Sequence, residues 1–205
     1  MNQRVPVEKP SFGLDAVSIY ERAAPCVVKV QGDRKIGTGF LIQYLAMYFI
    51  LTCAHVLEPI DNFTAKFLNG FSLRATCTFV SRKMDLAVLS PIIDENIPEF
   101  PSLELESSQL QPGKRCWILG SPYGMEGAFS GADILQAPLG DFIRFKALIA
   151  PGFSGSPLID AESGAVVGMV TGAAGTSLGF ALPIEPIRSE LTFFADNLTR
   201  VQQSR

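Results

Sequence analysis

Short segments rich in β-branched and aromatic residues recur along almost the whole chain, and this pattern constrains the fold most. About six such segments precede residue 92 and about six more follow residue 113, with turn residues between them. Many short strands separated by turn residues are typical of β-sandwiches and barrels. Asn69-Gly70, which separates two of the segments, is the strongest short hairpin signal. The sequence predicts an all-β fold of two antiparallel six-stranded barrels.

Helical spacing at both ends of the chain predicts a short helix that ends at Pro25 and a closing helix with Leu191, Phe194 and Leu198 on one face. An acidic, proline-bearing stretch between the two halves is interpreted as a linker. The expected bounds are about 24–93 for the N-terminal barrel, 94–112 for the linker, about 113–186 for the C-terminal barrel and 187–201 for the last helix.

Composition excludes some classes of function. The chain is 47% hydrophobic and 18% charged, with a net charge of -3 and no cluster of lysine and arginine, so nucleic acid is not expected as a partner. Residues 1–10 have no apolar core of a signal peptide, and no apolar run is long enough to span a membrane. The scattered cysteines lack the close pairs of a zinc site. A cytoplasmic or organellar protein without metal or cofactor is expected.

The stretch from Pro151 to Pro157 has the character of a nucleophilic serine on a tight loop. Gly152 lets the backbone bend so that the N–H groups of Gly152 and Ser154 point at one spot, as in an oxyanion hole. An α/β-hydrolase elbow needs glycine two residues after the serine, where this chain has Ser156. That fold is therefore excluded, although a plain turn serine remains the alternative.

A nucleophilic serine needs a base and a carboxylate that orients it. His55 is the only histidine and directly follows a predicted strand, so metal sites built on several histidines are excluded. Asp85 heads an apolar run, where an unpaired buried carboxylate would be costly. A structural histidine and a strand-edge aspartate are the alternatives, but together with Ser154 these residues form a candidate catalytic triad.

Three motifs in this order resemble those of the trypsin-like, chymotrypsin-fold serine proteases, most closely the HtrA/Deg branch. The motifs are Thr52-Cys53-Ala54-His55, Asp85-Leu86-Ala87-Val88-Leu89 and Gly152-Phe153-Ser154-Gly155-Ser156-Pro157. The resemblance covers roughly residues 15–190 and implies a peptidase domain over 11–190 with no PDZ domain after it. It implies a serine endopeptidase that works through an acyl-enzyme and acts on unfolded or misfolded proteins in protein quality control.

Three further positions concern the oxyanion loop, the specificity pocket and the triad carboxylate. Phe153 replaces the family's usual Asn or Asp before the serine, so the oxyanion loop is expected to pack differently from that of the family in the absence of substrate. By analogy, Leu148 occupies the position of the acid on the pocket floor of enzymes that cut after Lys or Arg, and Thr171 the position of a hydroxyl that supports the triad carboxylate. The expected pocket is apolar and favours small or aliphatic P1 residues; its members are Leu148, Ile149, Ala150, Met169, Val170, Thr171, Phe180 and Ala181.

Two alternatives concern function and assembly. A catalytically latent or chaperone-like module that binds polypeptides on the same fold is the alternative to a protease. Relatives commonly form homotrimers through N-terminal segments, for which Phe12 and Tyr20 are candidates. The alternative is a monomer whose aromatic residues dock on their own barrel.

Overall fold

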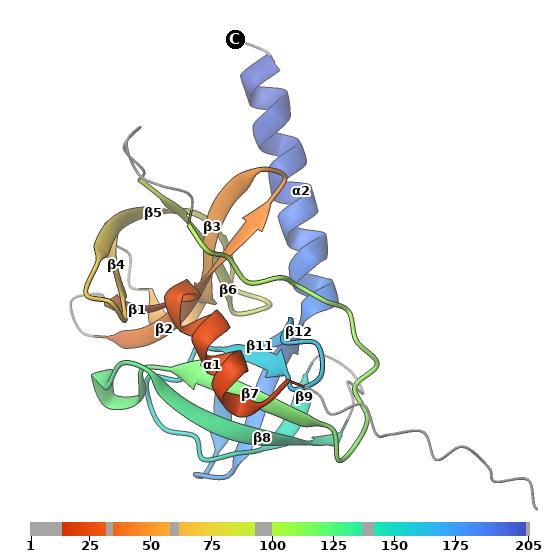
Figure 1. The fold of residues 1–205 in the computed structure, drawn as a ribbon. Coiled ribbons are helices and arrows are strands. Elements are labelled where there is room, and N and C mark those ends of the chain that lie inside the picture. Colours follow the sequence, from red (N-terminus) through yellow and green to blue (C-terminus); the bar gives the residue numbers. More distant parts are fainter. Residues whose placement is uncertain (1–13, 32–34, 58–61, 93–99, 137–141, 204–205) are drawn as a thin grey trace, which may run out of the picture.

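The computed structural model describes residues 14–31, 35–57, 62–92, 100–136 and 142–203, and it contains two closed six-stranded antiparallel barrels (Figure 1). This confirms the predicted fold class. The first barrel contains β1 (Val27–Gln31), β2 (Ile36–Tyr44), β3 (Met47–Cys53), β4 (Asn62–Phe67), β5 (Ser72–Ser81) and β6 (Leu86–Pro91). The second contains β7 (Arg115–Gly120), β8 (Ala128–Gln136), β9 (Ile143–Lys146), β10 (Pro157–Asp160), β11 (Val166–Ala174) and β12 (Leu178–Pro183).

Each barrel closes because its first and fourth strands in the chain also lie side by side. The order is β1-β2-β3-β6-β5-β4 in the first barrel and β10-β11-β12-β9-β8-β7 in the second. Among the described strands, closure leaves no free sheet edge. The Asn69-Gly70 turn joins β4 to β5 as predicted, with Gly70 at a φ of 85°. Leu45 and Ala46 also have positive φ in the β2–β3 turn, where no glycine announces the hairpin.

The predicted linker holds the barrels together where it is described. Leu103 N–H donates to Leu41 O of β2 at 2.9 Å, and Glu106 N–H donates to Val166 O of β11 at 2.9 Å. Leu103 itself is buried against the first barrel's core. The segment from residue 100 to 106 is therefore hydrogen-bonded to both barrels, so it restrains their relative placement.

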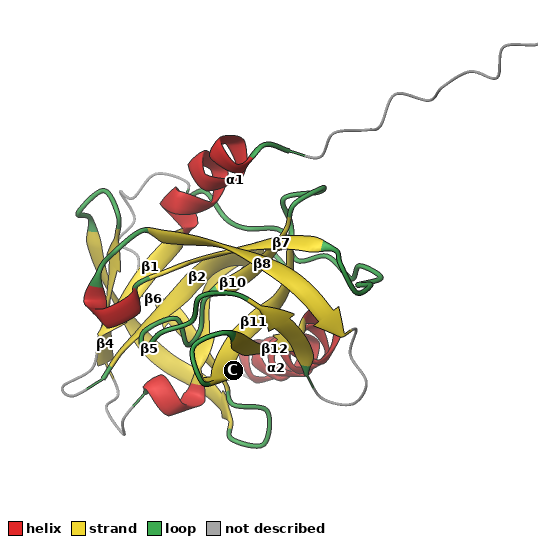
Figure 2. Cartoon of the chain, turned by 90° about the horizontal axis from the view of Figure 1, so that it is seen from below, coloured by secondary structure: helices red, strands yellow, loops and turns green. Residues whose placement is uncertain are grey.

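Two helices flank the barrels on different sides (Figure 2). The first, α1 (Ala16–Ala23), begins at Asp15, whose carboxylate accepts the N–H groups of Val17 and Ser18. A 3₁₀ turn over Ala24–Cys26 contains Pro25 and ends the helical segment. Tyr20 packs edge-on against Phe129 of β8, with ring centroids 5.5 Å apart. Phe12 lies outside the described residues.

The closing helix α2 (Ile184–Gln203) starts earlier than the sequence pattern indicated. Pro186 lies in its first turn, where proline removes no helical hydrogen bond, so it does not delay the helix. Leu191 is buried, and Phe194 contacts Phe49 and Phe79 of the first barrel at centroid distances of 5.9 and 5.8 Å. The helix follows the second barrel's last strand and packs on the first, so it also joins the two.

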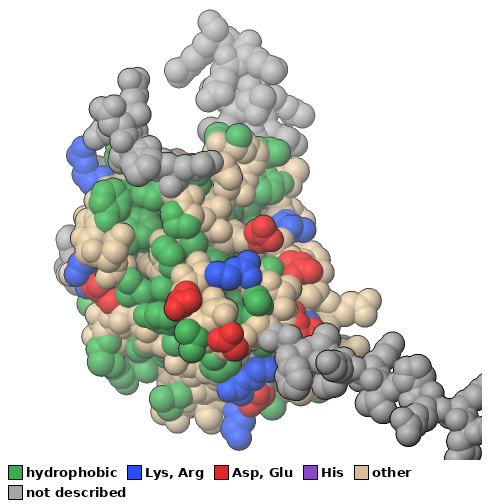
Figure 3. Space-filling model, viewed as in Figure 1, with side chains coloured by type: hydrophobic (Ala, Val, Ile, Leu, Met, Phe, Trp, Pro, Cys, Tyr) green, Lys and Arg blue, Asp and Glu red, His purple; other side chains and the backbone are tan. Residues whose placement is uncertain are grey.

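Charged side chains of both signs are interspersed over the face seen in Figure 3. Within the described residues, no helix has both the length and the apolar character that crossing a membrane requires.

Candidate active site

Strand pairing brings His55 and Asp85 together. His55 lies in a short 3₁₀ turn, Ala54–Val56, directly after β3, and Asp85 directly precedes β6. The two strands pair with Cys53 opposite Leu86, and Ala54 N–H donates to Asp85 O at 3.0 Å. Asp85 has a φ of 56°, a left-handed conformation that aspartate tolerates better than most residues. The register therefore sets the two side chains next to each other.

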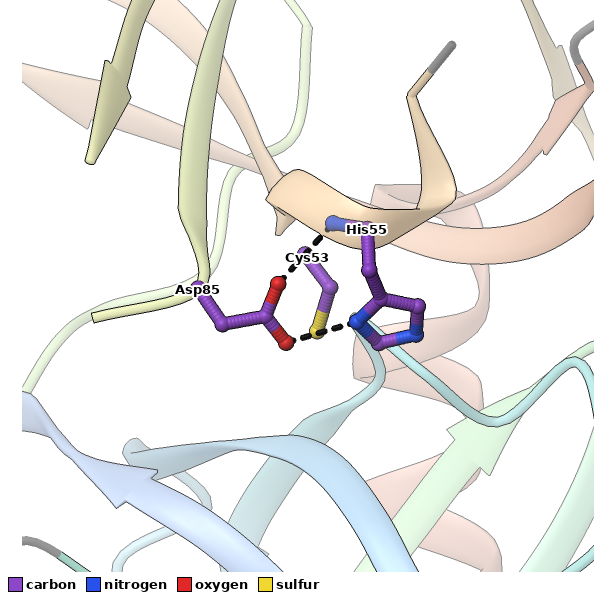
Figure 4. Close-up of side chains that lie close together, drawn as sticks. All are labelled: Cys53, His55 and Asp85. Atoms are coloured by element: carbon purple, nitrogen blue, oxygen red, sulfur yellow. Dashed lines mark hydrogen bonds and ion pairs between the residues drawn. The ribbon is translucent and has the colours of Figure 1, made fainter. Parts of the chain in front are cut away.

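The carboxylate of Asp85 contacts His55 twice (Figure 4). Its Oδ2 lies 2.6 Å from His55 Nδ1, and its Oδ1 accepts the His55 backbone N–H at 2.9 Å. Burial opposes ionisation of the carboxyl, but the hydrogen bonds from the side chain and backbone of His55 outweigh it, and the pKa of Asp85 is lowered from its usual value. The ionised Asp85 holds the proton on Nδ1, which leaves Nε2 as the acceptor.

Cys53 is the third side chain near this pair (Figure 4). Its thiol is buried and donates to Val170 O at 3.2 Å. The ligand atoms of Cys53, His55 and Asp85 lie within 4.8 Å of one another, as in some metal sites. The Cys53 thiol is already engaged with Val170 O, and burial and then the charge of Asp85 raise the pKa of that thiol well above its usual value. The donor set therefore favours a proton-transfer pair over a metal centre.

Ser154 reaches the same region from the second barrel. Its backbone O accepts Thr38 N–H of β2 at 2.8 Å. A Cβ added at Gly37 would lie 2.6 Å from both Val56 methyls and 3.2 Å from Ser154 O, so Val56 and Ser154 flank the same glycine. Ser154 thus lies close to the turn that carries His55. Among the described residues no hydrogen bond joins Ser154 Oγ to the His55 ring, as is common without substrate.

Two N–H groups of the serine loop are left free while their neighbours are bonded. Within the described part of the chain, the N–H groups of Gly152 and Ser154 donate no hydrogen bond. Pro151 O accepts Tyr123 N–H at 2.7 Å, and Phe153 O accepts Ser156 N–H at 2.9 Å. In a trans peptide the N–H points opposite to the C=O, so these two bonds fix the directions of the free N–H groups. Paired free donors beside a serine are what an oxyanion hole requires.

The loop is tightly constrained on both sides of Ser154. Gly152 has a φ of 105°, and a Cβ there would lie 2.3 Å from Ser121 O. Phe153, the departure from the family pattern, is 3% exposed and belongs to the second barrel's core. The loop is therefore anchored by an aromatic ring in an apolar environment.

A cavity of about 240 Å³ opens beside the serine. Its lining is mostly apolar and small, and comprises Ile149, Ala150, Pro151, Ser154, Val170, Gly172, Ala173 and Gly175. Of the residues expected from the sequence, Ile149, Ala150 and Val170 line this cavity. Pro151 and the small residues of the 172–175 segment were not anticipated, since nothing local in the sequence indicates that this segment faces the serine.

The other expected pocket residues lie elsewhere. Leu148 is 74% exposed and outside the lining, because the chain approaching the serine turns it to solvent. Met169 is fully buried in a core cluster that contains residues of both barrels. Thr171 Oγ1 donates to Phe180 O at 3.3 Å instead of to Asp85. Ala181 is fully buried in the second barrel's core, and neither it nor Phe180 lines the cavity.

Comparisons of the sequence find serine proteases among known proteins. "Serine protease HTR4" of Rattus norvegicus is 28% identical over 201 residues, covering 87% of this chain and 40% of the relative. "Probable periplasmic serine endoprotease DegP-like" of Halomonas elongata is 31% identical over 168 residues, covering 74% and 33%. The chain thus spans less than half the length of these relatives.

The fold also matches solved structures. Rv3671c from M. tuberculosis H37Rv, solved as a serine-to-alanine mutant in an inactive form, has a TM-score of 0.75 and 25% identity; the match covers 94% of this chain and 97% of that one. A serine endoprotease from Yersinia pestis has a TM-score of 0.77 at 24% identity, with coverage of 93% and 68%, and so supports the fold alone. Residues 37–169 match the model of the trypsin-like peptidase domain. With two barrels, a His55–Asp85 pair and a serine loop between them, this chain belongs to the trypsin-like peptidase family.

Proposed function

We propose that this chain is a serine endopeptidase whose triad is His55, Asp85 and Ser154. Ser154 Oγ attacks the scissile carbonyl while His55 Nε2 takes the hydroxyl proton, and the N–H groups of Gly152 and Ser154 stabilise the oxyanion. His55 then gives the proton to the leaving amine, and water hydrolyses the acyl-enzyme by the same steps. Asp85 stays ionised and stabilises the imidazolium. The scheme needs no cofactor.

The observation that carries this proposal is the joint geometry of the pair and the loop. Asp85 contacts both Nδ1 and the backbone N–H of His55, and the loop of Ser154 presents two free N–H groups. A module that only binds polypeptides would require neither. The family match and the names of the relatives support the same activity.

A fluorophosphonate probe tests the triad. The wild type should be labelled and should digest unfolded casein, and both activities should vanish in Ser154→Ala. Folded samples are verified by circular dichroism. Absence of labelling in folded wild-type protein would contradict the proposal and favour a latent, polypeptide-binding module, which the missing Ser154–His55 hydrogen bond would then explain.

The cavity beside Ser154 supports small or aliphatic residues at P1. Ile149, Ala150 and Val170 supply apolar walls, and none of the residues that line the cavity is charged. An apolar wall cannot pair a buried ammonium or guanidinium group. Peptides with Val, Ala or Leu at P1 should therefore be cut faster than matched peptides with Lys or Arg, and the reverse order would contradict this assignment.

Unfolded or misfolded proteins are the proposed substrates, and a homotrimer is the proposed assembly. The substrate proposal is tested by digesting the native form and the reduced, denatured form of one protein, and the denatured form should be digested faster.

The assembly proposal is tested by light scattering coupled to gel filtration, which measures the molar mass in solution. A monomer mass would contradict the trimer.

A further inference from the structure

Thr38 occupies an unusual place between the two barrels. It lies in β2 of the first barrel, opposite Lys29 of β1, and its residue surface is fully buried. A buried hydroxyl in a strand is costly unless it is hydrogen-bonded. Its partners come mainly from the second barrel.

Every polar atom of Thr38 is used. Its Oγ1 donates to Gly152 O at 2.7 Å and accepts Ser121 N–H at 2.9 Å. Its N–H donates to Ser154 O at 2.8 Å. Its carbonyl accepts the hydroxyl of Thr52 at 2.6 Å, in the strand that leads to the catalytic histidine. One residue therefore contacts both ends of the Gly152–Ser154 segment and the strand that carries the base.

The loop approaches Thr38 closely because glycines surround it. A Cβ at Gly155 would lie 2.0 Å from Thr38 O, and one at Gly120 would lie 2.8 Å from Thr38 Oγ1. Gly155 also has a φ of 87°, which favours glycine. The main chain of the second barrel thus packs closely against the carbonyl and the hydroxyl of Thr38.

These contacts determine how the oxyanion donors are held. The carbonyl of Gly152 belongs to the peptide unit between the two free N–H groups, and the Thr38 hydroxyl fixes its direction. The preceding peptide unit is fixed by Tyr123 N–H, and Ser154 O is fixed by Thr38 N–H. The N–H of the same unit, that of Phe153, donates to Ala150 O at 3.2 Å. Without the hydroxyl, the carbonyl of the central unit would lose its buried partner, and only this longer bond would still hold the unit.

We propose that Thr38 is a positioning residue that sets the oxyanion loop from the opposite barrel through its hydroxyl. This inference rests on the proposed peptidase activity, which it deepens. Thr38 touches neither the scissile bond nor the reacting atoms. It acts through the backbone of Gly152, so the orientation of the oxyanion donors depends on the docking of the two barrels.

Thr38→Val tests the hydroxyl because it keeps the shape and removes both hydrogen bonds. Loss of one oxyanion donor costs about 10²–10³ in kcat, so a displaced donor should lower kcat by roughly 10–100-fold. KM should change little, since Thr38 is not among the residues that line the cavity. Thr38→Ser keeps the hydroxyl and should recover most of the loss. Thr64→Val, on an exposed position of β4, is the matched control.

Two readouts separate positioning from folding. A peptide boronate that forms a tetrahedral adduct should lose affinity in Thr38→Val by a factor similar to the loss in kcat. A substrate peptide should bind Ser154→Ala and the Thr38→Val/Ser154→Ala double variant equally well. Three outcomes would each overturn the proposal. They are a loss of kcat that matches the loss of folded protein, an unchanged boronate affinity, and a Thr38→Ser variant as impaired as Thr38→Val.

An activity-independent measurement keeps this inference distinct from the proposed function. The backbone amide ¹⁵N shifts of Gly152, Phe153 and Ser154 should move in Thr38→Val and return toward the wild-type values in Thr38→Ser. If the wild type neither labels nor cleaves, the peptidase proposal fails. Unchanged amide shifts in Thr38→Val would overturn the role of Thr38 whether or not the wild type is active.

Discussion

Replacing Phe153 with alanine should destabilise the protein strongly, because an aromatic ring anchors the serine loop. Phe153 is 3% exposed and lies in the second barrel's core, with its Cδ1 2.9 Å from the position of a Cβ at Gly120. The side chain is therefore enclosed by the loop's own barrel, and its removal would leave a cavity directly behind the proposed oxyanion donors.

The magnitude follows from the burial. An aromatic side chain buries about 150–250 Å², which at about 25 cal/mol per Å² corresponds to roughly 4–6 kcal/mol. That figure is an upper estimate, since the unfolded chain already buries part of its surface. Measured Phe→Ala changes in cores cost about 3–5 kcal/mol. For a chain of this size, about 2–4 °C of Tm is lost per kcal/mol, so Phe153→Ala should lower Tm by roughly 6–20 °C.

Thermal unfolding followed by circular dichroism, with urea unfolding in parallel, measures this loss. Leu148→Ala is the matched control, because Leu148 lies five positions earlier in the same loop region but is 74% exposed, and its truncation should change stability by less than about 0.5 kcal/mol. Equal Tm values for Phe153→Ala and Leu148→Ala would refute the conclusion that the ring anchors the loop.

Four further outcomes are expected. Asp85→Asn should lower kcat by about 10⁴-fold, measured with the best peptide substrate, because the imidazole loses the carboxylate that fixes its tautomer; a loss below tenfold would contradict the triad. Burial raises the pKa of Asp85, but the hydrogen bonds from His55 lower it more. The ionised carboxylate therefore stabilises the fold at pH values above its usual pKa of 3.8, and this stabilisation is lost as the pH falls through the lowered pKa. The destabilisation by Asp85→Asn, measured by urea unfolding, should therefore shrink below about pH 4. Burial raises the pKa of Cys26 to about 11 and that of Cys116 to about 12, so both thiols should react with iodoacetamide at pH 8 only after unfolding; rapid labelling of the folded protein would contradict their burial. Lys114→Met removes the ammonium paired at 2.6 Å with the 2%-exposed Asp160, whose carboxylate then keeps, among the described residues, only the N–H of Glu162 as a partner. This should cost about 3–5 kcal/mol in urea unfolding, and a near-neutral change would contradict a buried pair.

The sequence alone determined the fold class and the kinds of candidate catalytic residue. Strand alternation, Asn69-Gly70 and proline positions are local signals, so they report local structure without the tertiary fold. The order of His55, Asp85 and Ser154 was likewise readable, because each stands in a short motif. The closing helix was recognised from its apolar face, although its start was expected at residue 187 and lies at Ile184.

Only the tertiary structure decided which residues meet across the barrels. Thr38 and Gly152 are 114 positions apart, and nothing near either residue indicates that they bond. The Cys53 contact with Val170, at a separation of 117, is equally invisible in the sequence. Leu148 was expected in the pocket from its place in the motif, but the backbone direction turns it to solvent. Local patterns fix which chemical groups a chain carries, whereas the docking of two closed barrels fixes their distances, because those distances depend on contacts between residues far apart in the chain.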